Sequence, residues 1–169
     1  TVVADGETVA FEQLWDFGTT LIARVEDGAD LAALKTSPGV TAFTVDGLNE
    51  PDDGQAFAIG AHLMRDAEGF KPYAAGVPDV IKHYGCNYIA RGGAVAALAG
   101  SFCPDRLVLM QFPDADEIVD FYWSDGYAPL LPIRLRSTVP RFVLMARSGA
   151  LPDSARQVVA KKLTASNKA

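Results

Sequence analysis

The chain has 169 residues and a mass of 18.0 kDa, with 49% hydrophobic residues and a formal net charge of −6. This composition predicts a globular protein built on one main domain, and it excludes a disordered chain. The acidic balance argues against a nucleic-acid partner, because phosphate binding needs clustered Lys and Arg. No apolar run approaches the roughly 20 residues of a membrane span, so no membrane partner is expected either.

The first residues, TVVADGETVAF, lack the basic region and apolar core of a secretory signal, so a cytoplasmic location is expected. Cys86 and Cys103 are too few for a disulfide framework and have no zinc-type spacing, which predicts buried free thiols. With two histidines and no nucleotide-binding glycine motif, the sequence predicts no metal and no cofactor. A haem would need His62 or His83 as its axial ligand.

The first region with a clear pattern runs from residue 19 to residue 48. TTLIARV (19–25), GADLAALKTS (28–37) and VTAFTVDGL (40–48) are typical of a strand, a helix and a strand. Pro38-Gly39 ends the helix, and the polar segment 49–55 is typical of a linker. Residues 1–52 are therefore predicted to form an N-terminal extension, either an added βαβ unit or a degenerate half-repeat of the main fold.

The next elements are a strand and a helix. AFAIGAHLM (56–64) predicts the strand, and Asp66 is placed to cap the helix that follows it. One face of this helix is apolar at spacings of three and four, comprising Phe70, Tyr73, Val77, Ile81 and Tyr84. Gly85 lies where a left-handed cap is expected, and Pro78 predicts a kink or break near residues 76–78.

Two further strands and a helix follow. Residues 87–99 predict a long strand in which Gly92-Gly93 marks a bulge or a bend, and RLVLMQF (106–112) predicts another strand. Asp114 and Glu117 form a capping pair at the start of a second helix, which SDGYAP (124–129) ends. LLPIRLRST (130–138) is expected to lead, as a loop or strand entry, into a last strand at 141–148. The tail, residues 151–169, predicts a short helix through Leu163 with frayed residues after it.

The predicted order of elements is strand, helix, strand, strand, helix, strand. Two halves of this kind fold into an α+β, ferredoxin-like βαββαβ domain, here at residues 53–150, with helices on one face of an antiparallel sheet. Several of the strands are apolar on both faces. The other sheet face is therefore expected to need a cover, and a homodimer is the simplest one.

A set of motifs in this domain matches a known family. The motifs are Tyr73, HYGCNYIARGG (83–93), Gly100, QFPDADEI (111–118) and SDGYAPLLPIR (124–134). With them, the segment from about Ala56 to Gly149 resembles the domain-of-unknown-function family 1330 (DUF1330), of the dimeric α/β-barrel superfamily. The resemblance implies a homodimer whose two sheets close into a barrel, with a pocket between sheet and helices in each protomer. The superfamily includes cofactor-independent monooxygenases, lactone isomerases, polyketide cyclases and haem proteins, so its fold alone gives no function.

The chain also departs from the family pattern. Where the family commonly has acids after Arg-Gly-Gly, before the next glycine and before Phe-Pro, this chain has Ala94, Ala99 and Gln111. It also has Cys86 in place of the second glycine of a Gly-Gly pair. If those carboxylates act as bases or pair with the arginine, that chemistry is absent or relocated here.

Arg91 is the most informative candidate residue. A guanidinium in an apolar strand is costly unless it is paired. It meets a distant carboxylate, reaches solvent, or holds an anionic ligand through the bidentate geometry that Lys cannot supply. The loss of the neighbouring acids favours the ligand, because it removes the nearest internal partners.

His62 and Tyr73 are the other catalytic candidates. His62 shares a strand face with Ala58, Gly60 and Met64, and one face of that strand is expected to line the pocket. There it is either a general base near neutral pH or a hydrogen-bonded structural histidine. Tyr73 matches a family position and is either a hydrogen-bond donor to a ligand or a core tyrosine.

Four residues are candidates for substrate binding: Tyr88, Ser124, Tyr127 and Arg134. Tyr88 and Tyr127 belong to an aromatic set around the space between helix and sheet, where core packing is the alternative. Ser124 is also placed to cap a helix end, and no nucleophile-elbow motif accompanies it. Arg134, with Arg136, is expected either to neutralise an anion at a pocket mouth or to pair on the surface.

These observations favour a homodimer that holds a small anionic organic molecule between sheet and helices. If it is an enzyme, cofactor-independent acid–base chemistry of the isomerase, cyclase or lyase type fits best, with His62 as base or acid, Arg91 as anion clamp and Tyr73 as donor. The alternative is a non-catalytic binding or accessory dimer that has lost its family's acids. In a weaker alternative, the N-terminal extension is a lid or an interface for another protein.

Overall fold

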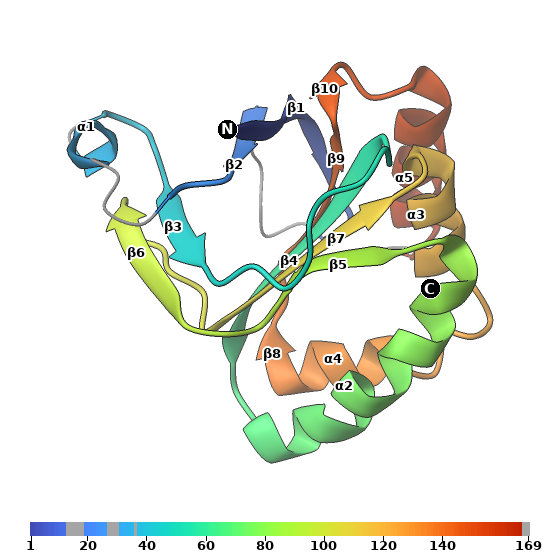
Figure 1. Ribbon diagram of the computed structural model, residues 1–169. Coiled ribbons are helices and arrows are strands. Elements are labelled where there is room, and N and C mark those ends of the chain that lie inside the picture. The colour runs from blue at the N-terminus through green and yellow to red at the C-terminus, as the bar shows by residue number, and fades with distance from the viewer. Residues whose placement is uncertain (13–18, 27–30, 36, 167–169) are drawn as a thin grey trace.

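The computed structural model describes residues 1–12, 19–26, 31–35 and 37–166. In this part of the chain, helices gather on one face of a curled, largely antiparallel sheet (Figure 1). Four strands make its centre, in the order β9-β4-β7-β5 with every neighbouring pair antiparallel. They are β4 (Ala56–Met64), β5 (Asn87–Arg91), β7 (Arg106–Phe112) and β9 (Phe142–Ala146).

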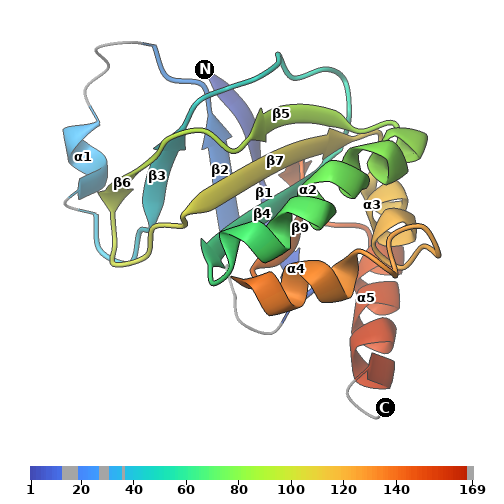
Figure 2. The same cartoon turned by 90° about the horizontal axis from the view of Figure 1, so that it is seen from below.

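The helical layer packs on one face of these strands. It comprises α2 (Ala67–Ile81), α3 (Ala115–Tyr122), α4 (Leu131–Ser137) and α5 (Asp153–Ser166), and a 3-10 turn at Lys82–Tyr84 follows α2. Figure 2 shows α2 and α4 lying side by side along this face. The core between these helices and the sheet is aromatic, with Phe11, Phe112, Phe121, Tyr127 and Phe142 almost fully buried. This packing forms the first of two hydrophobic cores.

The opposite face of the sheet forms a second hydrophobic core within the same chain. Phe57, Ile59, Leu109, Val143 and Met145 are buried there. Side chains of the N-terminal strands and of the long strand's second half pack against them. The strands that supply this cover are β1 (Val2–Ala10), β2 (Thr19–Ala23), β3 (Ala42–Val45) and β6 (Val95–Ala99). The homodimer was expected because this face was predicted to need a second protomer as its cover. That reason is wrong, because the chain covers the face itself.

The N-terminal extension adds strands to the main sheet, and one of them was not predicted. β1 pairs with β9 at Thr8–Ala10 and with β10 (Ser148–Gly149) near its middle, while β3 pairs with β6 to form a separate two-stranded sheet. A Cβ at Gly6 would lie 2.3 Å from the carbonyl oxygen of Ala146, so only glycine allows this close approach. α1 (Ala32–Lys35) is the described part of the helix expected over residues 28–37.

Several predicted elements are confirmed to the residue. β4 and β7 have the predicted bounds, the Asp66 side chain accepts a hydrogen bond from the Gly69 N–H, and that of Asp114 accepts one from the Glu117 N–H. Gly85 has a positive φ of 64° at the end of the 3-10 turn. The long strand bends at Gly92-Gly93, which divides it into β5 and β6.

Two proline-containing segments are more continuously helical than the sequence predicted. α2 runs through Pro78 without a break and ends at Ile81, because packing of its apolar face outweighs one missing hydrogen bond. Residues 131–137 form α4 instead of a strand entry, with a proline in the first turn, where its missing N–H is tolerated. A two-residue strand, β8 (Thr138–Val139), then pairs with the end of β4. None of the helices described is both long and apolar enough to cross a membrane.

Candidate functional site

The candidate site is a small pocket between the sheet and α2. Its polar lining consists of His62, Tyr73, Tyr88, Arg91 and Arg106. Seven further residues complete the wall: Gly60, Phe70, Ala74, Val77, Val108, Met110 and Phe142. About 20 Å³ is open to the centre of a water molecule, which is room for roughly one or two waters. Only a small group can enter the pocket as it stands.

Strand register brings the lining side chains to one face of the sheet. On β4 and β7 the lining residues alternate, and His62 lies directly across from Arg106. On β5, Tyr88 and Arg91 are three residues apart, so a regular strand would point them to opposite faces. An irregularity between Tyr88 and Ala90 shifts the register, so that Tyr88 pairs with Met110 and Arg91 with Val108. This bulge places Arg91 at the pocket.

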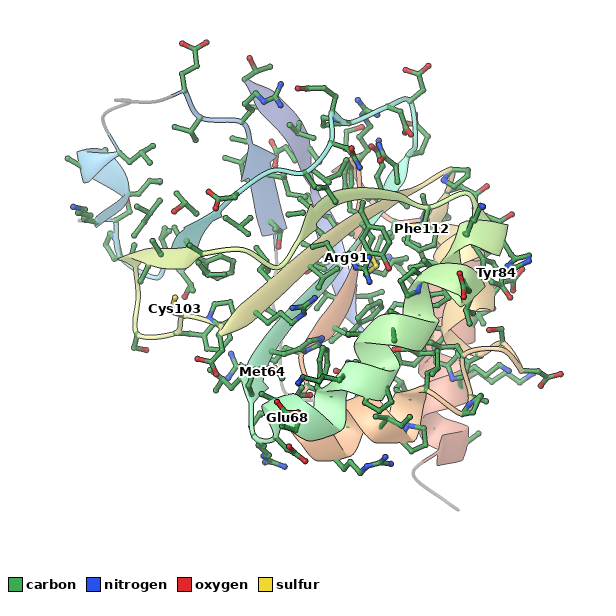
Figure 3. The ribbon with its side chains drawn as sticks, turned by 60° about the horizontal axis from the view of Figure 1, so that its bottom comes forward. Met64, Glu68, Tyr84, Arg91, Cys103 and Phe112 are labelled. Carbon is green, nitrogen blue, oxygen red and sulfur yellow. The ribbon has the colours of Figure 1, made fainter. Side chains whose placement is uncertain are left out.

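Arg91 meets a backbone carbonyl, not a carboxylate. Its Nη2 donates to the Ala74 oxygen at 2.9 Å, and its guanidinium lies 5.1 Å from the centre of the Tyr88 ring. Pro78 has no N–H, so α2 cannot supply the donor that the Ala74 oxygen would otherwise receive from position 78. Figure 3 shows Arg91 between β5 and α2. Within the described residues no carboxylate pairs with this exposed side chain, and its charge remains available at the pocket mouth.

Arg106 is a second cation in the pocket, and the sequence analysis missed it. Its guanidinium lies 5.4 Å from the centre of the Phe70 ring, and a Cβ at Gly92 would lie 2.9 Å from its Nη1. Its Nε is buried, with no hydrogen-bond partner in the described part of the chain. Burial, and then the neighbouring Arg91 charge, lower its pKa. Its position across from His62 was the only signal that could have found it.

His62 is buried at 2% exposure and is neutral at physiological pH. Burial lowers the pKa of its imidazole well below the usual value, and the charges of Arg134 and Arg106 lower it further. The Arg141 N–H donates to Nδ1 at 3.4 Å, so the ring proton resides on Nε2. A Cβ at Gly60 would lie 3.0 Å from Nε2, which shows that this nitrogen faces the pocket-lining side of β4. His62 therefore presents a donor to the pocket.

Tyr73 lines the pocket and connects it to a buried polar network. Its hydroxyl lies 3.4 Å from that of Tyr127, to which the Arg134 Nε donates at 3.0 Å. Arg134 also pairs with Glu12, and the Tyr122 hydroxyl donates to the same carboxylate oxygen at 2.9 Å. Burial raises the pKa of Tyr73 well above its usual value, so its phenol remains protonated.

The four predicted substrate-binding residues do not gather at the pocket. Tyr88 alone lines it, and burial raises the pKa of its phenol to about 12. Tyr127 is buried behind Tyr73, and Ser124 caps a turn by donating to the Phe121 oxygen at 2.8 Å and accepting from the Tyr127 N–H. Arg134 was expected at a pocket mouth or on the surface. That expectation is wrong, because Arg134 is fully buried on α4 and pairs with Glu12.

The three positions where the family's acids are missing have different surroundings. Gln111 is buried, its side-chain amide donates to the oxygens of Asp52 and Gly54, and its oxygen accepts from the Asp52 N–H. Ala99 is buried on β6, and Ala94 is exposed beside the bend. None of the three lines the pocket, and the side chains described as lining it include no carboxylate.

Both cysteines are free and partly buried, where full burial was expected. Burial raises the pKa of the Cys86 thiol to about 12, and the Asp52 charge adds to the shift. Among the described residues, no three His, Cys, Asp or Glu side chains cluster as a metal site would require.

Comparison with protein families gives a match. The family model described as "Domain of unknown function (DUF1330)" matches residues 55–147, which is more than half of the chain and spans every strand that lines the pocket. No curated protein matches the chain.

Proposed function

The chain belongs to the DUF1330 family over residues 55–147, and on that premise we propose that it binds a small carboxylate in the pocket between α2 and the sheet. The observation that carries the proposal is the pair of cations, Arg91 and Arg106, in a pocket whose described lining has no carboxylate. Burial and then the Arg91 charge lower the pKa of Arg106, and two such neighbouring guanidiniums gain most from an anion between them. In a protein of net charge −6, such a local positive field also favours anions over cations.

Binding is better supported than proton abstraction. A general base must present a lone pair to the substrate, and the bond from the Arg141 N–H to Nδ1 of His62 leaves the proton on Nε2. Tyr73 stays protonated as well. Cofactor-independent isomerase, cyclase or lyase chemistry at His62, Tyr73 and Arg91 therefore remains the second candidate function, and it would use these residues as donors.

The wider architecture is part of the same proposal. The strand order β9-β4-β7-β5 supports a ferredoxin-like domain, with the N-terminal strands as an addition to it. The homodimer expected from the sequence is not part of this proposal, because Phe57, Leu109 and Met145 are buried within a single chain.

Titration of the full-length chain with propanoate, followed by NMR chemical shifts, tests the proposal. We expect the shifts to map to the pocket, with Arg91→Ala and Arg106→Ala each weakening binding by about tenfold, as loss of one charge-assisted hydrogen bond does. The matched control is Arg136→Ala, since Arg136 is exposed on α4 and does not line the pocket. Equal affinity for the neutral analogue propanamide, or full affinity in both pocket variants, would refute an anion site.

A further inference from the structure

The hydroxyl of Tyr73, a residue of the pocket lining, ends a series of hydrogen bonds that begins at a buried charge. The series runs from Arg134 Nε to the Tyr127 hydroxyl at 3.0 Å, and from there to the Tyr73 hydroxyl at 3.4 Å. Arg134 is fully buried on α4, and Glu12 of the N-terminal extension pairs with its Nη2. Of the three side chains in this hydrogen-bond series, Tyr73 lines the pocket, and Tyr127 and Arg134 are buried behind it.

The burial of Tyr127 favours one direction for this series of hydrogen bonds, because a fully buried hydroxyl needs an acceptor for its proton. A guanidinium can only donate, so the Tyr127 oxygen accepts from Arg134. Within the described residues, the Tyr73 oxygen is the remaining group within hydrogen-bond distance of the Tyr127 hydroxyl, so Tyr127 donates its proton there. The Tyr73 oxygen then accepts one hydrogen bond, and its own proton has no described protein acceptor. Because Tyr73 lines the pocket, this proton is free for an acceptor that enters it.

Four of the five polar residues of the described lining offer donors in this way. His62 presents Nε2–H, Arg91 and Arg106 present guanidinium N–H groups, and Tyr73 presents O–H. A ligand that satisfies these four donors must offer acceptors to them. Because about 20 Å³ is open to water centres, the acceptor that enters must lie close to the carboxylate held at the mouth.

We propose that the ligand is a short 2-oxo acid, whose carboxylate binds Arg91 and Arg106 and whose carbonyl oxygen accepts from Tyr73, which Arg134 polarises through Tyr127. Tyr73 is thus a specificity-determining residue, while Tyr127 and Arg134 are positioning residues that act through it. The carbonyl lies one bond from the carboxylate, which suits a pocket with only about 20 Å³ open to water centres. The inference rests on the proposed carboxylate site and adds the second acceptor that this site selects.

Two three-carbon acids, pyruvate and propanoate, test the inference on the full chain. They carry the same carboxylate, and only pyruvate has the carbonyl. We expect pyruvate to bind about tenfold more tightly than propanoate, the value of one added hydrogen bond. Tyr73→Phe should bring the two dissociation constants together. Tyr84→Phe is the matched control, because Tyr84 lies outside the pocket lining and packs against Phe121.

A double-variant comparison tests the relay from Arg134. Tyr127→Phe should also reduce the preference for pyruvate without changing propanoate affinity, and Tyr73→Phe with Tyr127→Phe should lose no more than Tyr73→Phe alone. A purely structural role for Tyr127 would instead weaken both acids. Binding of both acids with equal affinity, unchanged by Tyr73→Phe, overturns the inference and leaves the carboxylate site standing. Failure of both acids to bind overturns the carboxylate site and the inference with it.

Discussion

At the scale of single residues, the two arginines of the pocket are held by contacts other than ion pairs. Arg91 binds a backbone carbonyl that a proline has left free, and Arg106 is held against Phe70 and Gly92. Neither interaction neutralises a charge. A buried arginine normally forms an ion pair with a carboxylate, as Arg134 does with Glu12 on the other side of Tyr73 and Tyr127. The contrast between the neutralised Arg134 and the two unneutralised pocket arginines is the physical basis of the proposed anion site.

His62 predicts a pH dependence of stability. Its folded-state pKa is lowered by burial and then by the charges of Arg134 and Arg106, so below about pH 6.5 the unfolded chain takes up a proton that the folded chain does not. The free energy of unfolding should therefore fall as pH decreases from 6.5, by up to about 1.4 kcal/mol per pH unit. Urea unfolding of the wild type and of His62→Gln at pH 7.5, 6.0 and 5.0 measures this contribution. The difference between the two proteins should shrink as the pH falls, whereas His83→Gln, on an exposed side chain, should follow the wild type.

Gln111 predicts the effect of restoring an acid that this chain lacks. Its amide donates to two carbonyls of the 52–54 segment, and an ionised glutamate has no proton for either. Gln111→Glu should lower the free energy of unfolding at pH 7.5 by about 2–4 kcal/mol, because it buries a charge and removes two hydrogen bonds, although Arg147 still donates to both carbonyl oxygens. Gln157→Glu, on the exposed face of α5, should change it by less than about 0.5 kcal/mol. Equal stability of the two variants would contradict a structural role for Gln111.

At the scale of secondary-structure elements, α2 and β5 are coupled through a missing hydrogen bond. Pro78→Ala supplies the N–H that the Ala74 oxygen lacks, so the variant should be more stable by about 1 kcal/mol or more. Arg91→Ala should then cost less in the Pro78→Ala background than in the wild type, with a coupling of about 1 kcal/mol in urea unfolding. Pro72→Ala is the control: it changes the same helix but completes a bond to residue 68, so its effect should simply add to that of Arg91→Ala.

The elements that the sequence analysis predicted well are those whose signal is local. The apolar run of β7 and the caps at Asp66 and Asp114 act within a few residues, and the structure confirms them. The candidate site was harder to predict from the sequence, because a bulge places Arg91 at the pocket and strand register places Arg106 across from His62. Both depend on strand pairing. The burial of Arg134 likewise depends on Glu12, which lies 122 residues away along the chain and outside the family match.

At the scale of the whole molecule, the N-terminal extension is part of the family domain's core. It covers one face of the sheet, and Phe11 packs among Tyr122, Trp123 and Phe142. Glu12 supplies the counter-charge of Arg134, whose side chain is fully buried. Residues outside the family match therefore hold the network that ends at the pocket.

Glu12→Ala tests this dependence. The substitution leaves Arg134 buried without its carboxylate, so the free energy of unfolding should fall by about 3–5 kcal/mol. Glu7→Ala removes another ion pair of the same segment, to Arg156, in which both side chains are more than a third exposed. It should cost about 1 kcal/mol or less. Similar losses in urea unfolding for the two variants would mean that Glu12 has no special role in the core.

The oligomeric state depends on the same cover. Residues of β1, β2, β3 and β6 already pack over Phe57, Ile59 and Leu109, so the full chain does not need a second copy to bury them. We expect sedimentation velocity to give a monomer near 18.0 kDa, contrary to the homodimer expected from the sequence. Deletion of residues 1–52 should expose that apolar face and remove Glu12, and the shortened chain should associate or lose solubility. A full-length dimer, together with a shortened chain that stays folded and monomeric, would contradict the view that the extension is an intramolecular cover.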